Sequence, residues 1–365
     1  MRESAKKIHV LHVTSGLGAG GKERQLFELV KNLDKEEFAC GVVTFNSNQH
    51  YSDKARECSA RYWELKKRPT RLEPLISIWK CFREFRPDVV HAWDSLSSFY
   101  VYLPCRVYKI PCINGSIRDV GIDVGWAYAF KRFFLKKADR VISNSAAGLK
   151  KYKVAGQVIY NVVDTSRFLP QSKTGEFNVI MTANFSDYKD HDTFLRAMAD
   201  LLQDKVIDNA YLVGDGPNRQ KHMDWITSAC PALLSKVHFT GIVRNVEEYL
   251  ANCQIGVLCS TKRFSEGISN SVLEYMAAGL VPIATDTGAA REIIKDGVNG
   301  FLFAPGDRQR IVNVIKQMKG DPKQKEIIVE AAKETINERF DLKTNMAAYA
   351  RLYRELKSRS PNDQN

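Results

Sequence analysis

The sequence predicts an α/β protein with two parallel sheets, and three observations support this prediction. Short apolar runs alternate with helical patterns along most of the chain, an order typical of parallel strands joined by helices. At 365 residues, the chain is long enough for two domains. A polar stretch over residues 160–175 interrupts the alternation, and the balance of charge changes there as well. We therefore expect two α/β domains joined near the middle of the chain.

Each expected element follows from the spacing of its apolar residues. Short continuous apolar runs indicate strands that are buried on both faces, as in parallel sheets. These strands are Ile8–Val13, Cys40–Phe45, Val89–His91, Arg140–Ser143, Val179–Ala183, Ala210–Val213, Val237–Thr240, Ile255–Cys259, Val281–Ala284 and Gly300–Phe303. Apolar residues three and four positions apart indicate helices. The clearest helical patterns are Glu23–Leu33, Leu72–Phe85, Thr193–Leu202 and Ser271–Ala278.

The distribution of charge predicts an anionic partner for the first half of the chain. The formal net charge is +12, and residues 1–170 hold 29 Lys and Arg against 17 Asp and Glu, so the whole excess lies there. A one-sided positive field favours a phospholipid surface, an acidic acceptor or nucleic acid. The alternative is a solvated basic face that keeps the protein in solution.

Cysteine usage and hydropathy predict a cytoplasmic protein. The eight cysteines are scattered, with neither a C-x-x-C pair nor a His at zinc-binding spacing, and so indicate thiols in a reducing compartment. The polar N-terminus leads into an apolar strand that is too short for a signal peptide. No run approaches the roughly 18 apolar residues of a membrane span.

The glycine-rich turn after the first expected strand has the spacing of a dinucleotide-binding motif. Gly16, Gly18 and Gly21 form G-x-G-x-x-G. An NAD site also needs an acidic residue at the end of the second strand, and here Cys40–Phe45 is followed by Asn46. We therefore expect no NAD. The turn still suits an anion, because glycine lets the backbone approach a ligand and the following helix presents N–H groups.

The densest functional signal is a pair of glutamates around a helix start in the second half. A polar loop follows the strand Ile255–Cys259, and Ser269 or Asn270 can cap a helix there. Glu266 lies just before this start, and Glu274 lies about 6–8 Å inside it, at 1.5 Å per residue. This spacing fits a diphosphate and the ribose beyond it. Solvated charge is the alternative, although the apolar neighbours of Glu274 make an unpaired charge costly.

This segment resembles the E-x7-E region of retaining glycosyltransferases of family 4, also called glycosyltransferases group 1, which have the GT-B fold. Further motifs of that family occur in the same order along nearly the whole chain. They are the GG-x-E-R turn at 20–24, the N-G-V-D linker at 161–164, the G-D-G-P turn at 214–217, V-x-F-x-G at 237–241, and the G-G-x-x-E and D-G-x-x-G turns at 287–292 and 296–300. Their ordered combination is far more specific than any one motif.

The resemblance implies domain boundaries. It implies two Rossmann-like parallel-sheet domains that face each other across a cleft. The N-terminal, acceptor-side domain is expected at 1–165 and is completed by an amphipathic C-terminal helix at about 345–365, in line with the family. The C-terminal domain, which binds the nucleotide sugar, is expected at 166–344.

The resemblance also implies the residues of the donor site. Glu274 is expected to hold the ribose, Glu266 to contact the donor sugar, and Lys189 to bind the diphosphate. The base is expected near Val243 and Arg244. The other expected donor-binding residues are Gly20, Gly21, Lys22, Asn184, Gly214, Gly267, Ile268, Ser269 and Asn270. The expected catalytic residues are Glu266, Lys189, His91 and Arg263.

One departure from the family pattern concerns the charge on the diphosphate. Many members carry an arginine five residues before the lysine, and this chain has Asn184 there. We expect Arg263 to supply the missing charge because it lies close to Glu266 in the sequence, with Lys262 and Lys22 as alternatives.

A second departure concerns the strand before the cleft, which often ends H-x-H in the family and reads His91-Ala92-Trp93 here. His91 and Trp93 share one face of the strand. Three alternatives stay open: His91 acts on the donor, Trp93 and Asp94 shape an altered pocket, or His91 is structural.

The resemblance implies transfer of a hexosyl group from a UDP- or GDP-sugar to a hydroxyl of a saccharide or lipid-linked acceptor, with retention of configuration. The expected setting is surface polysaccharide, lipopolysaccharide or glycolipid biosynthesis. No metal or cofactor is expected, since cations and a helix dipole stabilise the leaving diphosphate, and we interpret the D-x-D at 190–192 as accidental. The alternatives are a sugar-nucleotide 2-epimerase and a non-catalytic nucleotide-sugar-binding protein. No nucleic-acid-binding motif is evident.

Residues 125–137 predict contact with a membrane surface. They mix aromatic residues with basic clusters, as an interfacial helix does. A buried helix with a charged edge explains the same pattern. Together with the positive first half, the segment leads us to expect peripheral attachment to the anionic inner face of the cell membrane.

Overall fold

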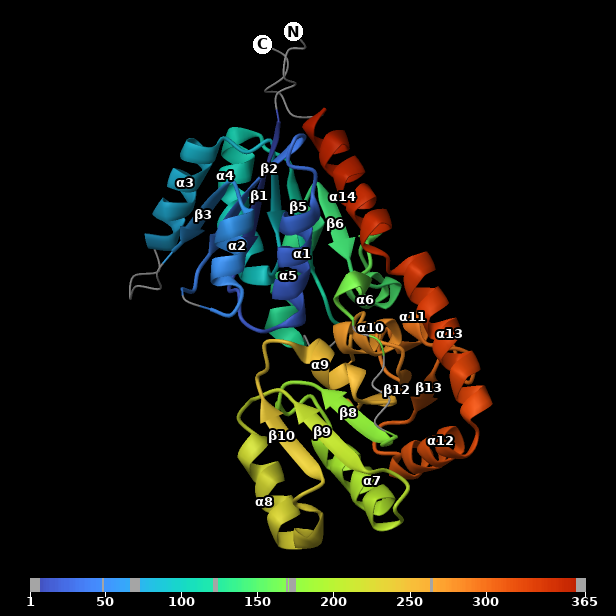
Figure 1. The fold of residues 1–365 in the computed structure, drawn as a ribbon. Coiled ribbons are helices and arrows are strands. Elements are labelled where there is room, and N and C mark those ends of the chain that lie inside the picture. Colours follow the sequence, from blue (N-terminus) through green and yellow to red (C-terminus); the bar gives the residue numbers. More distant parts are fainter. Residues whose placement is uncertain are drawn as a thin grey trace. The chain divides into compact units, whose positions relative to one another are not determined.

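The computed structural model describes residues 7–47, 49–65, 73–120, 124–168, 170, 175–262 and 265–358. It divides into two compact units, each with its own parallel sheet (Figure 1). The first unit comprises Met1–Arg118, Asp123–Asn161 and Lys343–Asn365, and the second comprises Asp119–Ile122 and Val162–Leu342. A short segment from the first half of the chain thus belongs to the second unit, and the last helix belongs to the first.

The described part of the first unit contains a seven-stranded parallel sheet with the order β3-β2-β1-β4-β5-β6-β7. Its strands are β1 (Ile8–Thr14), β2 (Phe38–Thr44), β3 (Arg61–Glu64), β4 (Val89–Ala92), β5 (Cys112–Ile117), β6 (Arg140–Ser143) and β7 (Gln157–Val158). The central strand β1 pairs with β2 from Ile8 opposite Phe38, and with β4 from Val10 opposite Val89.

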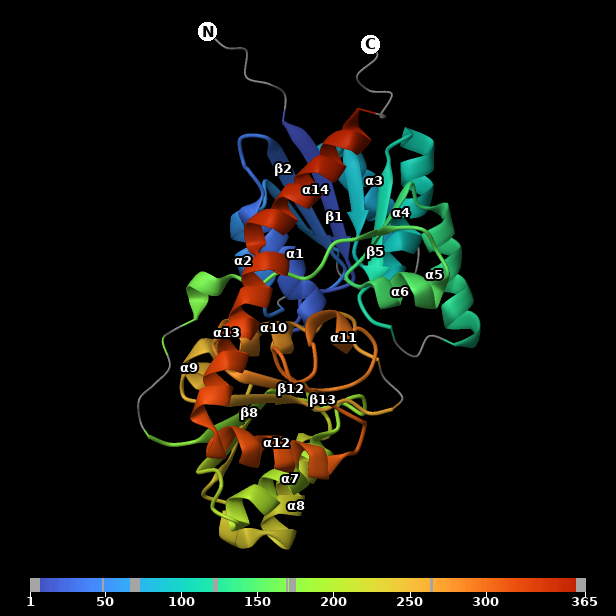
Figure 2. The same ribbon diagram turned by 90° about the vertical axis from the view of Figure 1, so that its right-hand side faces the viewer.

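Helices cover both faces of this sheet (Figures 1 and 2). The described helices are α1 (Gly21–Asn32), α2 (Ser52–Cys58), α3 (Glu73–Phe85), α4 (Ser95–Tyr108), α5 (Gly125–Lys137), α6 (Ala146–Tyr152) and α14 (Leu342–Lys357). Val10 and Val42 are buried in the core that includes α1 and α14. Leu11 and Val43 are buried in the core that includes α3 and α4. Successive strand residues therefore enter opposite cores, as the two-residue period of a strand requires.

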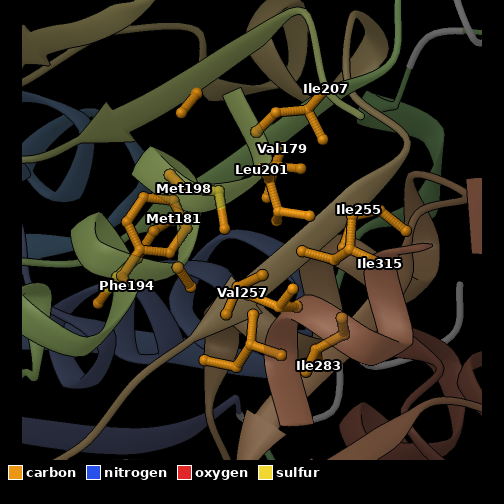
Figure 3. Packing of buried hydrophobic residues seen from close by; sticks show 14 of the residues in the cluster. Val179, Met181, Phe194, Met198, Leu201, Ile207, Ile255, Val257, Ile283 and Ile315 are labelled. Carbon is orange, nitrogen blue, oxygen red and sulfur yellow. The ribbon is translucent and has the colours of Figure 1, made fainter. Parts of the chain in front are cut away.

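The described part of the second unit contains a six-stranded parallel sheet with the order β10-β9-β8-β11-β12-β13. Its strands are β8 (Asn178–Thr182), β9 (Asn209–Val213), β10 (Val237–Gly241), β11 (Ile255–Leu258), β12 (Val281–Thr285) and β13 (Phe301–Phe303). Its helices are α7 (His191–Gln203), α8 (Arg219–Ala229), α9 (Val246–Ala251), α10 (Asn270–Ala277), α11 (Ala290–Ile293), α12 (Arg308–Gly320) and α13 (Pro322–Arg339). Figure 3 shows Val179 and Val257 of the sheet packing with Phe194 and Met198 of α7.

Every strand expected from an apolar run is present, and three further strands occur in the described parts of the chain. β5 contains Asn114, Gly115 and Ser116, which have low strand propensity, and it is buried by its neighbours rather than by its own hydrophobicity. β3 is a charged edge strand, and β7 has two residues. Among the described residues, no helix combines the length and hydrophobicity that crossing a membrane requires.

Candidate functional site

Two loops of the second unit bring Lys189 and Glu266 together. Lys189 follows β8 and Glu266 follows β11, so both lie at the carboxyl ends of neighbouring strands. The Lys189 ammonium donates to the Glu266 carboxylate, and Ser260 Oγ donates to the same oxygen at 3.3 Å. The backbones of the two loops are also joined, because Asp190 N donates to Cys259 O at 3.1 Å. The fold thus makes a half-buried ion pair from residues 77 positions apart.

The backbone of the Glu266 loop is held from two sides. Ala289 N donates to Glu266 O at 2.9 Å, and a Cβ added to Gly288 would lie 2.0 Å from that oxygen. Val120 N donates to Ser265 O at 2.9 Å. The segment that the first half of the chain contributes to the second unit therefore lies beside the candidate site. Sequence reasoning did not identify Val120, and it recorded Gly288 only as part of a turn motif.

Helix α10 begins directly after this loop and carries Glu274. The loop residues expected to bind the donor lead into the helix, which has Ser269 as its N-cap and Asn270 as its first residue. Its N-terminus is the positive end of the helix dipole and favours an anion. Glu274 lies one turn further along and is buried. An anion-favouring helix end is thus followed by a buried carboxylate, and the expected order of diphosphate and ribose along them stays a prediction.

Tyr275 fixes the position of α10. Its hydroxyl accepts a hydrogen bond from Thr182 N at 2.7 Å, and Ser271 Oγ donates to Thr182 O at 2.7 Å. The Tyr275 ring also packs on Gly256 of β11, where an added Cβ would lie 2.2 Å from the ring. The helix that carries Glu274 is therefore anchored to β8 and β11, the strands whose loops hold the ion pair.

Other expected donor residues also lie at strand ends of the second unit. Asn184 is exposed after β8, while Val243 is half-buried and Arg244 exposed after β10. Gly214 follows β9 with φ +140°, and a Cβ there would lie 2.1 Å from Ala183 O. Gly214 thus allows the backbones after β8 and β9 to approach closely.

The candidates for the missing diphosphate charge have different surroundings. Arg263 lies outside the described residues, whereas Lys262 is described and is exposed. In the first unit, Gly20 and Gly21 form the start of α1, and the Lys22 ammonium lies 3.3 Å from the Glu23 carboxylate.

Asp94 joins this glycine-rich turn to the start of α4. Its Oδ2 accepts from Ser15 N at 2.7 Å and from the Lys22 ammonium at 2.8 Å, and its Oδ1 accepts from Ser97 N at 2.9 Å. Burial by itself raises the pKa of Asp94, but Lys22 and the hydrogen bonds outweigh it and lower the pKa well below its usual range. Lys22 is therefore already paired with two carboxylates of its own unit, which makes it a weaker candidate for the diphosphate charge.

His91 lies in the core of the first unit. It is fully buried, and its Nδ1 is 2.9 Å from the Tyr353 hydroxyl of α14. Its ring stacks on Trp93 with centroids 4.6 Å apart, and the Arg118 guanidinium covers Trp93. Burial, together with neighbouring His12 and Arg118, lowers the pKa of His91 well below its usual value, so the ring is neutral near pH 7. These contacts favour the structural alternative for His91, and Trp93 is buried with it.

The two aspartates of the D-x-D at 190–192 have different partners. Asp190 caps α7 by accepting from Thr193 N at 3.0 Å, whereas Asp192 lies 3.4 Å from the ring of His222. Among the described residues, no group of three His, Cys, Asp or Glu side chains is placed to hold a metal ion.

The two units, each a parallel sheet covered by helices with its functional loops at strand ends, form the GT-B fold. The solved structure of Anabaena HepE in complex with UDP-glucose is similar, with a TM-score of 0.83 and 20% identity, over 95% of this chain and 100% of that one. A family model described as Glycosyltransferase Family 4 matches residues 19–167, and one described as Glycosyl transferases group 1 matches residues 176–321. The chain is a glycosyltransferase with the GT-B fold.

Two curated relatives are similar to most of the chain. The lipopolysaccharide core biosynthesis glycosyltransferase LpsD of Rhizobium meliloti is 23% identical over 361 residues, which cover 95% of this chain and 98% of LpsD. The sulfoquinovosyl transferase SQD2 of Arabidopsis thaliana is 26% identical over 291 residues, which cover 70% of this chain and 54% of SQD2. The chain thus spans nearly all of LpsD and about half of SQD2.

Proposed function

We propose that this protein is a retaining, metal-independent glycosyltransferase of family 4. It transfers a hexosyl group from a UDP- or GDP-sugar to a hydroxyl of a saccharide or lipid-linked acceptor, in surface polysaccharide or glycolipid biosynthesis. The observation that carries the proposal is the Lys189–Glu266 ion pair next to the start of α10. The buried Glu274 lies one helical turn after that start. The names of LpsD and SQD2, both transferases of sugars, support it.

Lys189 and α10 act on the leaving group. Cleavage of the bond between the anomeric carbon and the diphosphate oxygen leaves negative charge on the diphosphate, which a lysine and a helix N-terminus stabilise. We infer that Lys189 exchanges the Glu266 carboxylate for the diphosphate when donor binds. Glu266, released from the ion pair, then contacts the donor sugar.

The acceptor oxygen forms the new bond to the anomeric carbon. Its proton passes to the departing phosphate oxygen, so neither a protein nucleophile nor a metal ion enters the balance. Attack on the face that the diphosphate leaves retains the configuration. Glu274 acts at a distance from this centre by accepting hydrogen bonds from the ribose hydroxyls.

Glu274→Ala tests the donor site. We expect two quantities to fall together by about 10–100-fold: the affinity for UDP or GDP, measured by calorimetric titration, and the transfer rate at low donor concentration. The reason is that a hydrogen bond to a charged group contributes about 1.5–3 kcal/mol. Glu326→Ala, an exposed glutamate on α13, is the matched control and should leave both values unchanged. Normal affinity and turnover in Glu274→Ala would rule out the proposed site.

Product analysis distinguishes the alternatives. Proton NMR of the product should show the anomeric configuration of the donor, with one free nucleoside diphosphate per glycoside formed. An altered nucleotide sugar without a glycoside would identify an epimerase. Tight binding of a nucleotide sugar without any conversion, over a panel of saccharide and lipid-linked acceptors, would identify a non-catalytic binding protein.

A further inference from the structure

Helix α4 exposes an apolar stripe on its outer face. Leu96, Phe99, Leu103 and Val107 are 40–57% exposed, and their spacing of three and four residues places them on one side of the helix. The buried side of the same helix includes Val101 and packs in the core. Both sides of α4 are therefore apolar, whereas the outer side of a surface helix is normally polar.

Helix α5 lies beside α4 and continues this surface (Figure 2). Trp126 is 77% exposed and Phe133 is 49% exposed. The Trp126 ring stacks on Phe130 with centroids 5.0 Å apart, and Phe130 lies 6.1 Å from Phe99 of α4. The rings thus form a continuous surface across both helices. We call it the α4–α5 face; its exposed apolar residues are Leu96, Phe99, Leu103, Val107, Trp126 and Phe133.

Positive charge predominates around the α4–α5 face. Neither α4 nor α5 contains an acidic residue. Arg106, Lys136 and Lys137 are exposed on these helices, and the Lys137 ammonium lies 5.9 Å from the Phe133 ring centroid. The nearby Asp139 is matched by Arg106 at 3.8 Å. The cations therefore border the apolar stripe without an opposing excess of carboxylates.

The second unit has no comparable surface within the part of the chain that the structure describes. Its large exposed apolar side chains are distributed over separate loops and helices: Tyr188, Leu234, Ile242, Val298 and Ile327. Single exposed apolar residues are normal on a protein surface, whereas a contiguous patch marks an interaction site. The α4–α5 face is such a patch.

We propose that the α4–α5 face docks on the surface of an anionic lipid bilayer. Tryptophan and phenylalanine insert at the boundary between headgroups and acyl chains, and the lysine and arginine side chains reach the lipid phosphates. Charge complementarity and the aromatic composition favour a bilayer over a protein partner. The inference goes beyond the transfer reaction and does not rest on it, because the contacts that carry it all lie in the first unit.

Co-sedimentation of the full chain with vesicles tests the proposal. Vesicles of phosphatidylcholine with 30% phosphatidylglycerol should bind the protein at low salt, and pure phosphatidylcholine vesicles should bind it more weakly. Leu103→Ser/Trp126→Ser removes two exposed apolar side chains, and Lys136→Glu/Lys137→Glu reverses two charges. We expect each double variant to bind anionic vesicles at least about tenfold more weakly, because it loses either two side chains that insert into the bilayer or two cations that reach the lipid phosphates.

Leu234→Ser/Ile327→Ser is the matched control, because it also removes two exposed apolar side chains but from the second unit. This control should bind vesicles like the wild type. Stabilisation by UDP or GDP in thermal unfolding should be the same in all variants, which separates a failure of docking from a failure of the donor site. No vesicle binding by the wild type, or equal losses in the control, would overturn the proposal. A dimer in sedimentation velocity that only Leu103→Ser/Trp126→Ser dissociates, without vesicle binding, would assign the face to self-association instead.

Discussion

Gly288→Ala is expected to disable transfer while leaving the protein folded. The added Cβ would lie 2.0 Å from Glu266 O, and ordinary contact begins near 3.4 Å, so the Glu266 backbone must move by about 1.4 Å. A displacement of about 1 Å at a reacting centre can reduce the rate about 100-fold. We therefore expect kcat/KM for the donor to fall about 100-fold. An alanine at φ +58° also costs about 1–2 kcal/mol of stability.

Gly297→Ala separates displacement from backbone strain. Gly297 has φ +73°, and an added Cβ there has nothing within 4 Å. It should lose a similar free energy of unfolding, measured by urea denaturation, yet keep kcat/KM within about twofold of the wild type because no site residue moves. If both variants are equally active, or equally inactive at equal stability, the position of the Glu266 backbone does not control catalysis and the reasoning is refuted.

Three further predictions concern Asp94, Tyr353 and metals. Asp94→Asn should lower the free energy of unfolding at pH 7 by about 1.5–3 kcal/mol. Folding depresses the pKa of Asp94, so its contribution to the free energy of unfolding is full above the unfolded pKa of about 3.9. That contribution is lost as the pH falls through the folded pKa, and the stabilities of the two proteins should therefore converge in acid. A difference in stability that does not change with pH, measured by urea titration, would contradict this. Tyr353→Phe should cost about 1–3 kcal/mol, because it removes the partner of a buried histidine nitrogen, while kcat stays unchanged. A tenfold loss of kcat without loss of stability would instead favour a catalytic His91. Transfer should continue in excess EDTA, and a loss of activity that Mn²⁺ or Mg²⁺ restores would show that a metal takes part.

The fold was largely predictable because parallel strands are buried on both faces and are therefore continuous apolar runs. β8 and β11 are such runs, whereas β5 is a strand only because its neighbours pair with it on both sides. The sequence could not reveal this pairing, since it depends on contacts made after the chain has folded.

The candidate site was predictable in part. Glu266 and Glu274 stand close in the sequence, so helix geometry and a motif suffice to relate them. The contacts of Val120 with Ser265 and of Lys22 with Asp94 join distant segments and have no local signal. His91 occupies a motif position, but it is buried in a core that α14 completes. This burial also joins distant segments and has no local signal in the sequence.

The place of α14 in the fold has a consequence for the synthesis of the chain. Its residues Tyr349, Leu352, Tyr353 and Leu356 belong to the core of the first unit, although the ribosome makes them after the whole sheet of the second unit. While the chain emerges, the face of the first sheet that contains Val10 and Val89 lacks its last covering helix, and transiently exposed apolar surface is prone to aggregation. N-terminal domains usually fold first during synthesis. Here, the part of the chain that is made first completes its core last.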